Sequence, residues 1–441
     1  MATIGTGQST TIDDLTPEQR KAQVKRSMIA AAVGTSIEWY DFFLYNVAAA
    51  LIFPAAFFPN SDPYVGMMLS FGGNFVGFAA RPLGALIFGH YGDRMGRKVA
   101  MIVSLGMMGG ATMIMGVLPT YATLGVLAPA LLIFLRVLQG IGVGGNWGAS
   151  VLLAGEWSDP KKRGFATSWA QFGAPAGMLL ANGALLIMTL MMTETQFQAW
   201  GWRVPFLLSF VLIIFGLVIR KRIEETPVFK SLQKRGMIAK LPVVEVFKHN
   251  WKEVLLTCFL RTGQQVPFYI FTTYVLAYAV QTLGFPRATI LTLVMIMSAL
   301  SMITIPLMGA WSDRIGRPKI TAIGCVIMMI FPFIYFGMLD TLSLPLVAIA
   351  ILLGLPSQDF QYGPQAAYIS ESFPGSRRAS GASLGYQLAS ITAGGPAPLI
   401  AVALYQRYQT SMAVAAYVSV CAVISLICVG LLGVKKDHDH L

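Results

Sequence analysis

The stretch GHYGDRMGRK at 89–98 returns as GAWSDRIGRPK at 309–319, so the second copy begins 220 residues after the first. A further match follows each copy, because Glu156 precedes Arg163 by seven residues and Glu371 precedes Arg378 by seven. Repetition at a fixed spacing is typical of a duplicated unit. The sequence therefore predicts two halves with the same order of elements, each with this charged, glycine-containing loop in the same place.

Composition indicates that both halves lie in a membrane. Of the 441 residues, 55% are hydrophobic and only 12% are charged, whereas soluble proteins carry about 25% charged residues. A membrane-spanning helix needs about 20 apolar residues, and this length can supply a dozen of them with little chain left for a soluble domain. The net charge of +12 would also fit a nucleic-acid binder, but the positive residues lie between the apolar runs.

Apolar runs of helical length predict an all-α membrane protein with twelve transmembrane helices in two six-helix bundles. The expected domains are an N-terminal tail at 1–26, a first bundle at 27–219, a linker at 220–252, a second bundle at 253–434 and a tail at 435–441. The predicted spans are centred near Val33, Phe75, Met108, Leu138, Met178, Leu212, Ile270, Met297, Met328, Leu353, Ile391 and Ile424.

Positive charge predicts the orientation. Lysine and arginine concentrate in cytoplasmic loops of membrane proteins. Of the 32 lysines and arginines, all but six fall in the two tails, the linker and the loops that alternation places on the same side. The six exceptions are Arg81, Arg136, Arg203, Arg261, Arg287 and Arg407. We therefore expect both termini, the tails and the linker in the cytoplasm. The four cysteines lie singly in apolar runs, which favours packing over disulfides or metal binding.

The duplicated motif resembles the signature of the major facilitator superfamily. Further patterns resemble its metabolite:proton symporter family, and shikimate-permease-like members in particular: EWYDF at 38–42, RPLG at 81–84, and YGP at 362–364 leading to ESFP at 371–374. The resemblance implies alternating access between two bundles, transport driven by the proton motive force, and no cofactor. One position departs from the family, because the fourth span reads GGNW at 144–147, with Asn146 where the family usually has glutamate.

Charged residues inside the predicted spans are candidates for proton coupling, since a charge at mid-bilayer costs about 2.5–3.5 kcal/mol or more. We expect Asp41 or Glu38 to accept a proton while Arg136, in a fourth-span pattern that resembles the superfamily's proton-coupling motif, balances the carboxylate. Arg81 is a further member of this group. The alternative is a static ion pair that only fixes helix packing.

Polar and aromatic residues on the spans that would line a central cavity are candidates for substrate binding. Amides are the better candidates, because an unsatisfied amide in hydrocarbon is costly and a wet cavity removes that cost. Aromatic rings in spans also serve as packing or interface anchors. The candidates are Asn146, Trp147, Gln171, Arg261, Gln264, Gln265, Tyr269, Asp359, Gln361, Tyr362 and Gln387.

The duplicated motif predicts a cytoplasmic gate, because its aspartates can accept hydrogen bonds from arginine or from the N-terminus of a neighbouring helix. The alternative is charge that only sets the topology. The expected gate residues are Asp93, Arg94, Arg97, Glu156 and Arg163 in the first half, with Asp313, Arg314, Arg317, Glu371 and Arg378 in the second.

These observations together predict a proton-coupled importer of a small polar metabolite, such as a shikimate-like acid or a dicarboxylate. We expect a monomer in a bacterial inner membrane, with protons, a small molecule and lipid as its only partners and no metal or nucleic acid. An uncoupled facilitator or an exporter of the same fold is the nearest alternative, and a membrane receptor is the alternative from another class. Nothing in the sequence resembles the active-site motif of an enzyme.

Overall fold

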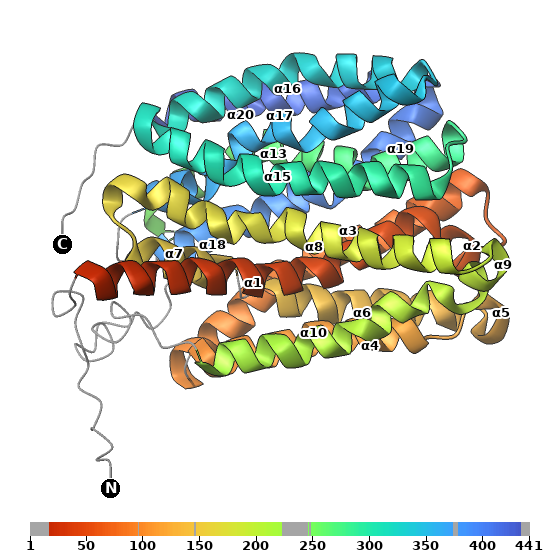
Figure 1. Cartoon of the computed structure of the whole chain (residues 1–441), viewed down its shortest axis with the longest axis horizontal. Helices are drawn as coiled ribbons and strands as arrows, with labels where there is room; N and C mark the ends of the chain where they lie inside the picture. Colours follow the sequence, from red (N-terminus) through yellow and green to blue (C-terminus); the bar gives the residue numbers. More distant parts are fainter. Residues whose placement is uncertain are drawn as a thin grey trace, which may run out of the picture.

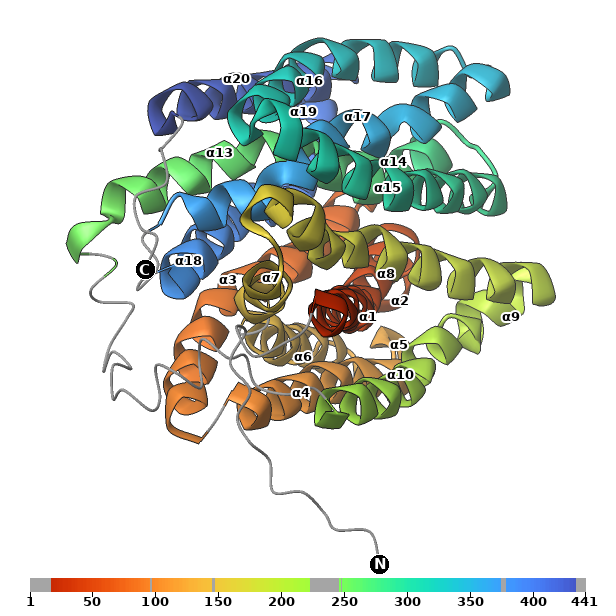
Figure 2. The same ribbon diagram turned by 60° about the vertical axis from the view of Figure 1, so that its left-hand side comes forward.

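The structure, a computed structural model, describes residues 17–95, 97–144, 147–222, 246, 248–373 and 378–433. These residues form helices and short connections, with no strand among them. The helices of the first half occupy one side of the molecule and those of the second half the other, which is visible in both orientations (Figures 1 and 2).

The first half contains six helical passages. They are α1 (Pro17–Leu51); α3 (Pro63–Met95); α4 (Arg97–Val117); α6 (Leu127–Gly144) followed by α7 (Trp147–Trp157); α8 (Arg163–Met191); and α10 (Arg203–Arg222). Short helices join them at the loops: α2 (Phe53–Phe57), α5 (Tyr121–Leu124), η2 (Pro160–Lys162), α9 (Glu194–Gln196) and the π-helical turn η3 (Phe197–Gly201).

The second half repeats this order. Its passages are α13 (Trp251–Tyr269) with η4 (Ile270–Tyr274), α14 (Val275–Ala277) and η5 (Tyr278–Thr282); α15 (Arg287–Ile315); α16 (Arg317–Asp340); α17 (Leu344–Glu371); α18 (Arg378–Ala389) with η7 (Ser390–Gly394) and α19 (Pro396–Tyr408); and α20 (Met412–Leu432).

Length and hydropathy identify the membrane passages. Eight described passages are long and apolar enough to span a bilayer, and the bent pair Glu194–Gly201 with Arg203–Val218 makes a ninth. The passages of α1, α4 and α13 complete the twelve, and two of these three carry buried charge, which lowers their hydropathy. The outer surface is apolar, as a bilayer requires; Leu207, Phe210, Val211 and Ile214 of α10 are all exposed.

Each predicted span centre lies within a helical passage, but two lie in π-helical turns. Ile270 begins η4, and Ile391 lies in η7 directly before Gly394 and Pro396. Proline removes a helical hydrogen bond, and π turns are often found at functional sites. Gly173 and Pro175 occupy the corresponding place in the fifth passage, but α8 continues through both.

Glycines bring α3 and α6 into backbone contact. A Cβ on Gly84 would overlap the backbone of Ile141, and a Cβ on Gly144 would overlap the carbonyl of Arg81. Close approach of this kind is available only to small residues and is a common way for membrane helices to associate. It fixes the position of Arg81 relative to α6, which carries Arg136.

We predict that Gly84→Ala destabilises the protein by about 1–3 kcal/mol, because the added methyl overlaps backbone that cannot turn aside. Gly106→Ala on α4 is the matched control, since its new methyl would meet nothing within 4 Å. Thermal unfolding of the purified proteins measures both. Equal transition temperatures for Gly84→Ala and the wild type would contradict the packing described here.

Candidate functional site

Arg136 lies at the centre of an amide network in the first half. Its guanidinium donates to the side-chain oxygens of Gln139 and Asn74 and, at 3.4 Å, of Asn46. It lies 4.0 Å from the ring centre of Tyr45 and 4.5 Å from that of Phe42. Neutral amides and ring faces therefore surround this cation, which is 1% exposed.

Asp41 is close to this network but does not bind Arg136. The amide of Gln139 donates to the backbone carbonyl of Asp41 at 3.1 Å and to the hydroxyl of Thr112 at 2.8 Å, so a glutamine joins the two charged residues. The carboxyl group of Asp41 is buried near the hydroxyls of Thr112 and Ser209, but neither of its oxygens has a hydrogen-bond partner among the described residues. The ion pair expected from the sequence is not formed in this conformation.

Two further arginines are buried, one in each half. Arg81 of α3 lies 4.4 Å from the ring centre of Phe42 and 4.3 Å from that of Phe78. Arg261 of α13 donates to the backbone carbonyl of Tyr386 at 2.6 Å, and its guanidinium lies 3.1 Å from the ring centre of the same tyrosine. The two positive charges act on each other. No ion pair of the described residues includes Arg81, Arg136 or Arg261.

A cavity lies between the halves beside Arg81. Its lining combines one acid, one base, an amide and four aromatic rings, and all but Val143 of the lining residues are buried. The lining residues are Thr35, Glu38, Trp39, Phe42, Arg81, Val143, Trp147, Tyr386 and Gln387. Contacts across the interface bound it: the rings of Trp147 and Tyr386 stack at 3.6 Å, and the amide of Gln387 donates to the carbonyl of Gly144 at 3.3 Å.

Several predicted substrate residues lie at or beside this cavity. Trp147 and Gln387 line it, and Gln171 accepts a hydrogen bond from the indole of Trp147 at 3.1 Å. Tyr269 packs against Phe78 and Phe42. Gln265 donates to Ser390, which also accepts from Arg261.

Other predicted residues turn elsewhere. The carboxyl of Asp359 lies against α15, where Ser301 donates to it at 2.7 Å, and Gln361 packs against Gly324 of α16. Gln264 is buried in α13, with its side-chain oxygen lacking a described partner. Tyr362 is an exception, because it packs against Phe268 and lies near Tyr386 and Arg261, beside the cavity. Asn146 lies outside the described residues.

The sequence interpretation missed residues that act through these groups. Tyr386 contacts both Arg261 and Trp147, and Gln365 accepts from the Nε of Arg261 at 3.3 Å. Asn46 and Asn74 hold Arg136. Buried amides within apolar spans are the signal that could have indicated the last three, since each needs a polar partner.

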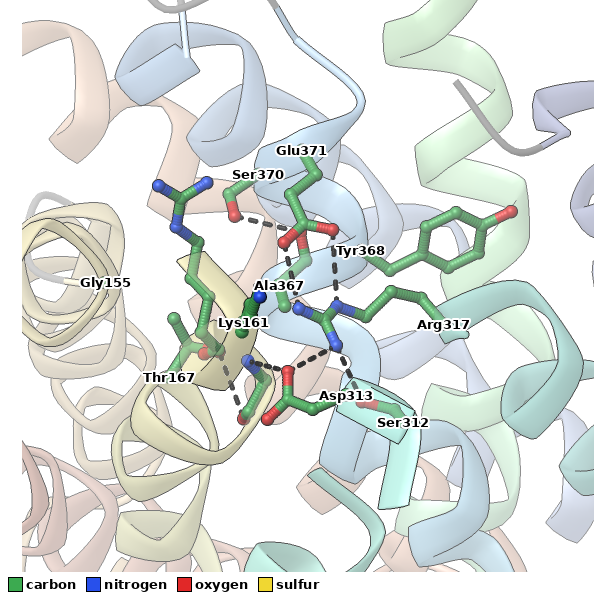
Figure 3. Close-up of polar contacts among 12 residues, drawn as sticks. Gly155, Lys161, Thr167, Ser312, Asp313, Arg317, Ala367, Tyr368, Ser370 and Glu371 are labelled. Carbon is green, nitrogen blue, oxygen red and sulfur yellow. Dashed lines mark hydrogen bonds and ion pairs between the residues drawn. The ribbon is translucent and has the colours of Figure 1, made fainter. Parts of the chain in front are cut away.

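The second copy of the duplicated motif forms a contact between the halves, which we call the Asp313 latch: Asp313, Arg317 and Glu371 with the backbone of Gly164 and Phe165. Asp313 accepts the backbone N–H groups of Gly164 at 2.9 Å and Phe165 at 2.8 Å, in the first turn of α8. Arg317 donates to Asp313 at 2.6 Å and to Glu371 at 3.1 and 3.2 Å (Figure 3). A carboxylate at the positive end of a helix is stabilising.

Two of the other predicted gate residues, Arg163 and Arg314, do not join this latch in the described structure. Arg314 is exposed, and Arg163 begins α8 without a described ion pair. The side chains of the remaining five lie outside the description: Asp93, Arg94, Arg97, Glu156 and Arg378.

A second contact joins the halves at the opposite end of α15. Arg287, the first residue of α15, forms a two-pronged ion pair with Glu194 at 3.1 and 3.1 Å. Gln281 also donates to the carbonyl of Ala50 at 2.6 Å. With the Asp313 latch closed as well, the halves touch at both ends of α15, and we call this conformation the enclosed state.

Comparison with known proteins agrees with this architecture. The model of the Major Facilitator Superfamily matches residues 31–398. The chain belongs to the major facilitator superfamily. Two Escherichia coli relatives are the inner membrane metabolite transport protein YhjE, 37% identical over 98% of this chain and 99% of that protein, and the shikimate transporter, 38% identical over 87% and 88%. This facilitator is therefore a membrane transporter and not an enzyme.

A solved structure shows the same fold. The partially occluded, inward-open form of the xylose transporter XylE from E. coli has a TM-score of 0.72 and 17% identity to this facilitator, and covers 92% of this chain and 97% of that one.

We predict that Asp313→Asn opens the facilitator at the latch, because a neutral amide binds Arg317 and the first turn of α8 more weakly than a carboxylate does. A cysteine at Ser168, buried beneath Gly309 at the α8–α15 contact, should react several-fold faster with a polar maleimide in this variant. Asp340→Asn is the control, since among the described residues Asp340 binds Tyr278 and Ser411, both of its own half. Equal rates in all backgrounds would rule out a closing role for the latch.

Proposed function

We propose that this facilitator is a proton-coupled symporter that imports a small organic anion across the bacterial inner membrane. The observation that carries the proposal is the distribution of buried charge. Arg81, Arg136 and Arg261 are at most 2% exposed, and no described acid pairs with any of them. Buried charge without a counter-charge is costly, and an anionic substrate would supply that counter-charge.

The side chains that line the cavity are suited to an anion with a compact apolar frame. Nε and Nη2 of Arg81 lack a hydrogen-bond partner among the described residues, so the guanidinium has donors for a carboxylate. The rings of Trp39, Phe42, Trp147 and Tyr386 line the same space and would pack against the carbon frame. A hydroxylated cyclic acid or a dicarboxylate has this combination of groups.

A ligand in this position would bind both halves at once. Arg81 belongs to α3 of the first half, while Tyr386 and Gln387 belong to α18 of the second. In transporters built from repeats, substrate sites at the interface of the repeats allow the halves to rock around the ligand. Substrate binding would thereby favour the enclosed state in which both end contacts are closed.

Asp41 is the proposed proton acceptor. Its carboxyl group is buried beside two hydroxyls. Gln139 connects Asp41 to Arg136, because its amide N–H donates to the backbone carbonyl of Asp41 and its side-chain oxygen accepts from Arg136. Because neutral amides rather than a carboxylate surround Arg136, its positive charge is not neutralised and can attract an anion. An anion arriving near the arginines adds negative charge, which favours a proton on a neighbouring carboxyl group. The proton motive force would then be the only energy source, without a cofactor.

The named relatives support the substrate class and the proton coupling, and the distribution of positive charge supports the orientation in the membrane. A shikimate transporter is among the relatives, and one neighbouring solved structure is a proton:xylose symporter. The distribution of lysine and arginine favours both termini in the cytoplasm, which would place the Asp313 latch on the cytoplasmic side and the Glu194–Arg287 pair on the periplasmic side.

We predict that Asp41→Asn abolishes uphill uptake of shikimate in proteoliposomes with an imposed proton gradient and leaves exchange of internal for external shikimate intact. The neutral amide cannot release and rebind a proton, whereas exchange needs no net proton movement. Asp62→Asn, on the exposed loop before α3, is the matched control. Accumulation at the wild-type level in Asp41→Asn would refute the assignment.

We predict that Arg81→Gln lowers uptake by at least tenfold, because the substrate carboxylate loses a charged donor worth about 1.5–3 kcal/mol.

Malate, proline and glycine betaine serve as competitors that differ in net charge. If the zwitterions compete better than the acids, the anion part of the proposal is wrong. If wild-type uptake persists with a protonophore, the transporter is an uncoupled facilitator.

A further inference from the structure

Asp359 is a buried acid that the transport site described above does not use. It lies on α17, is 0% exposed, and points at α15 rather than at the cavity. Its position is not explained by an ion pair, because no described basic side chain lies within ion-pair distance. An ionised carboxylate in this setting would be costly.

The charged groups on the surrounding helices are engaged elsewhere. Asp313, Arg317 and Glu371 form the latch at one end of α15, Arg163 lies at that same end at the start of α8, and Arg287 and Asp340 lie at the opposite end. Arg261 of α13 turns toward Tyr386, Ser390 and Gln365. Only the hydroxyls of Ser301 and Thr304 bind Asp359 among the described side chains.

The hydrogen bonds of Asp359 are unequal in a way that a protonated carboxyl explains. Ser301 and Thr304 both contact Oδ2, while Oδ1 has no described partner. The Thr304 hydroxyl also lies 3.3 Å from the carbonyl of Leu300 and 3.4 Å from that of Ser301. Since a hydroxyl has one proton, Thr304 can donate it to a carbonyl and accept a second proton from Oδ2.

From this geometry we infer that Asp359 is a second proton-binding site, located in the second half and separate from Asp41. In the enclosed conformation Oδ2 carries the proton, donates it to the Thr304 hydroxyl and accepts from Ser301. Oδ1 is then the carbonyl oxygen of a neutral acid, which tolerates the lack of a donor far better than a carboxylate oxygen does.

Helix α15 connects this site to the Asp313 latch. Thr304 and Asp313 lie nine residues apart on α15, or about 13.5 Å along the helix. Between them, a Cβ on Gly309 would come within 2.7 Å of the side chain of Ser168 in α8, and a Cβ on Gly363 of α17 would come within 2.7 Å of the carbonyl of Ile305. Helix α15 is in close backbone contact with α8 on one side and with α17 on the other. Movement of α8 at the latch would therefore shift α15 relative to Asp359 on α17.

The proton would therefore be held while the latch is closed and released when it opens. The site deepens the proposed symport, since it adds a proton to the transport cycle, but its test does not depend on Asp41 or on the identity of the substrate. Infrared difference spectroscopy detects the carbonyl stretch of a protonated carboxylic acid directly.

The first measurement compares wild-type protein with Asp359→Asn in lipid nanodiscs at neutral pH. We expect the variant to lose one carboxylic-acid carbonyl band. Loss of a carboxylate band instead would show that Asp359 is ionised and would overturn the proposal. Repeating the comparison in an Asp41→Asn background assigns the band to one acid, so that failure of the Asp41 assignment is recognised separately.

The second measurement uses Thr304→Val, which keeps the shape of the side chain and removes the hydroxyl. The Asp359 band should shift to higher frequency, as expected for a lost hydrogen bond, and it provides a readout even if Asp359→Asn does not fold. Thr292→Val is the matched control, because its exposed hydroxyl binds only the carbonyl of Ala288 on the same helix. An unshifted band in Thr304→Val would overturn the assigned partner.

The third measurement tests the link to the latch. In Asp313→Asn the Asp359 band should weaken and a carboxylate band should grow as the pH is raised, whereas the wild-type band should persist to higher pH. Identical titrations of the two proteins would overturn the coupling between the latch and the proton site.

Discussion

The constraint on which this structure depends is the lack of water in the hydrocarbon core, where every charge must find its partners inside the protein. In this protein two buried basic side chains lie apart from two buried acidic ones, and neutral groups surround each of them. Amides, ring faces and a backbone carbonyl surround Arg136 and Arg261, whereas hydroxyls lie beside Asp41 and Asp359. In the proposed mechanism, this separation leaves the charge of the arginines available to an incoming anion and the acids available to protons, which static ion pairs would not allow.

The two end contacts use different chemistry. At one end the carboxylate of Asp313 accepts backbone N–H groups at the start of α8, a helix of the other half. At the other end the guanidinium of Arg287 forms an ion pair with Glu194, an exposed carboxylate. Exposed ion pairs contribute about 0–1 kcal/mol, while the Asp313 latch is half-buried and joins three charged side chains. The Glu194–Arg287 end should therefore open more readily than the latch.

The sequence predicted the fold well because helix length, apolar runs and the duplication are local signals. It predicted which charged residues are buried but not their partners, because these depend on how each helix is rotated. Residues two apart on a helix point about 200° from each other, so Asp359 and Gln361 face different neighbours. Gln139 between Asp41 and Arg136, and the pairing of Glu194 with Arg287 across 93 residues, leave no sequence pattern.

The close packing around Gly309 limits which residues can replace this glycine. Its bare Cα lies against Ser168 of α8, and its backbone N–H lies beside Gly363 of α17. A side chain added at Gly309 would overlap Ser168 and the backbone of Gly164 in α8, so a substitution here would disturb the fit between the halves. Because the backbone of Gly309 already lies beside Gly363, α15 has little room to move toward α17 and relieve that overlap, so we expect only glycine to be tolerated at this position.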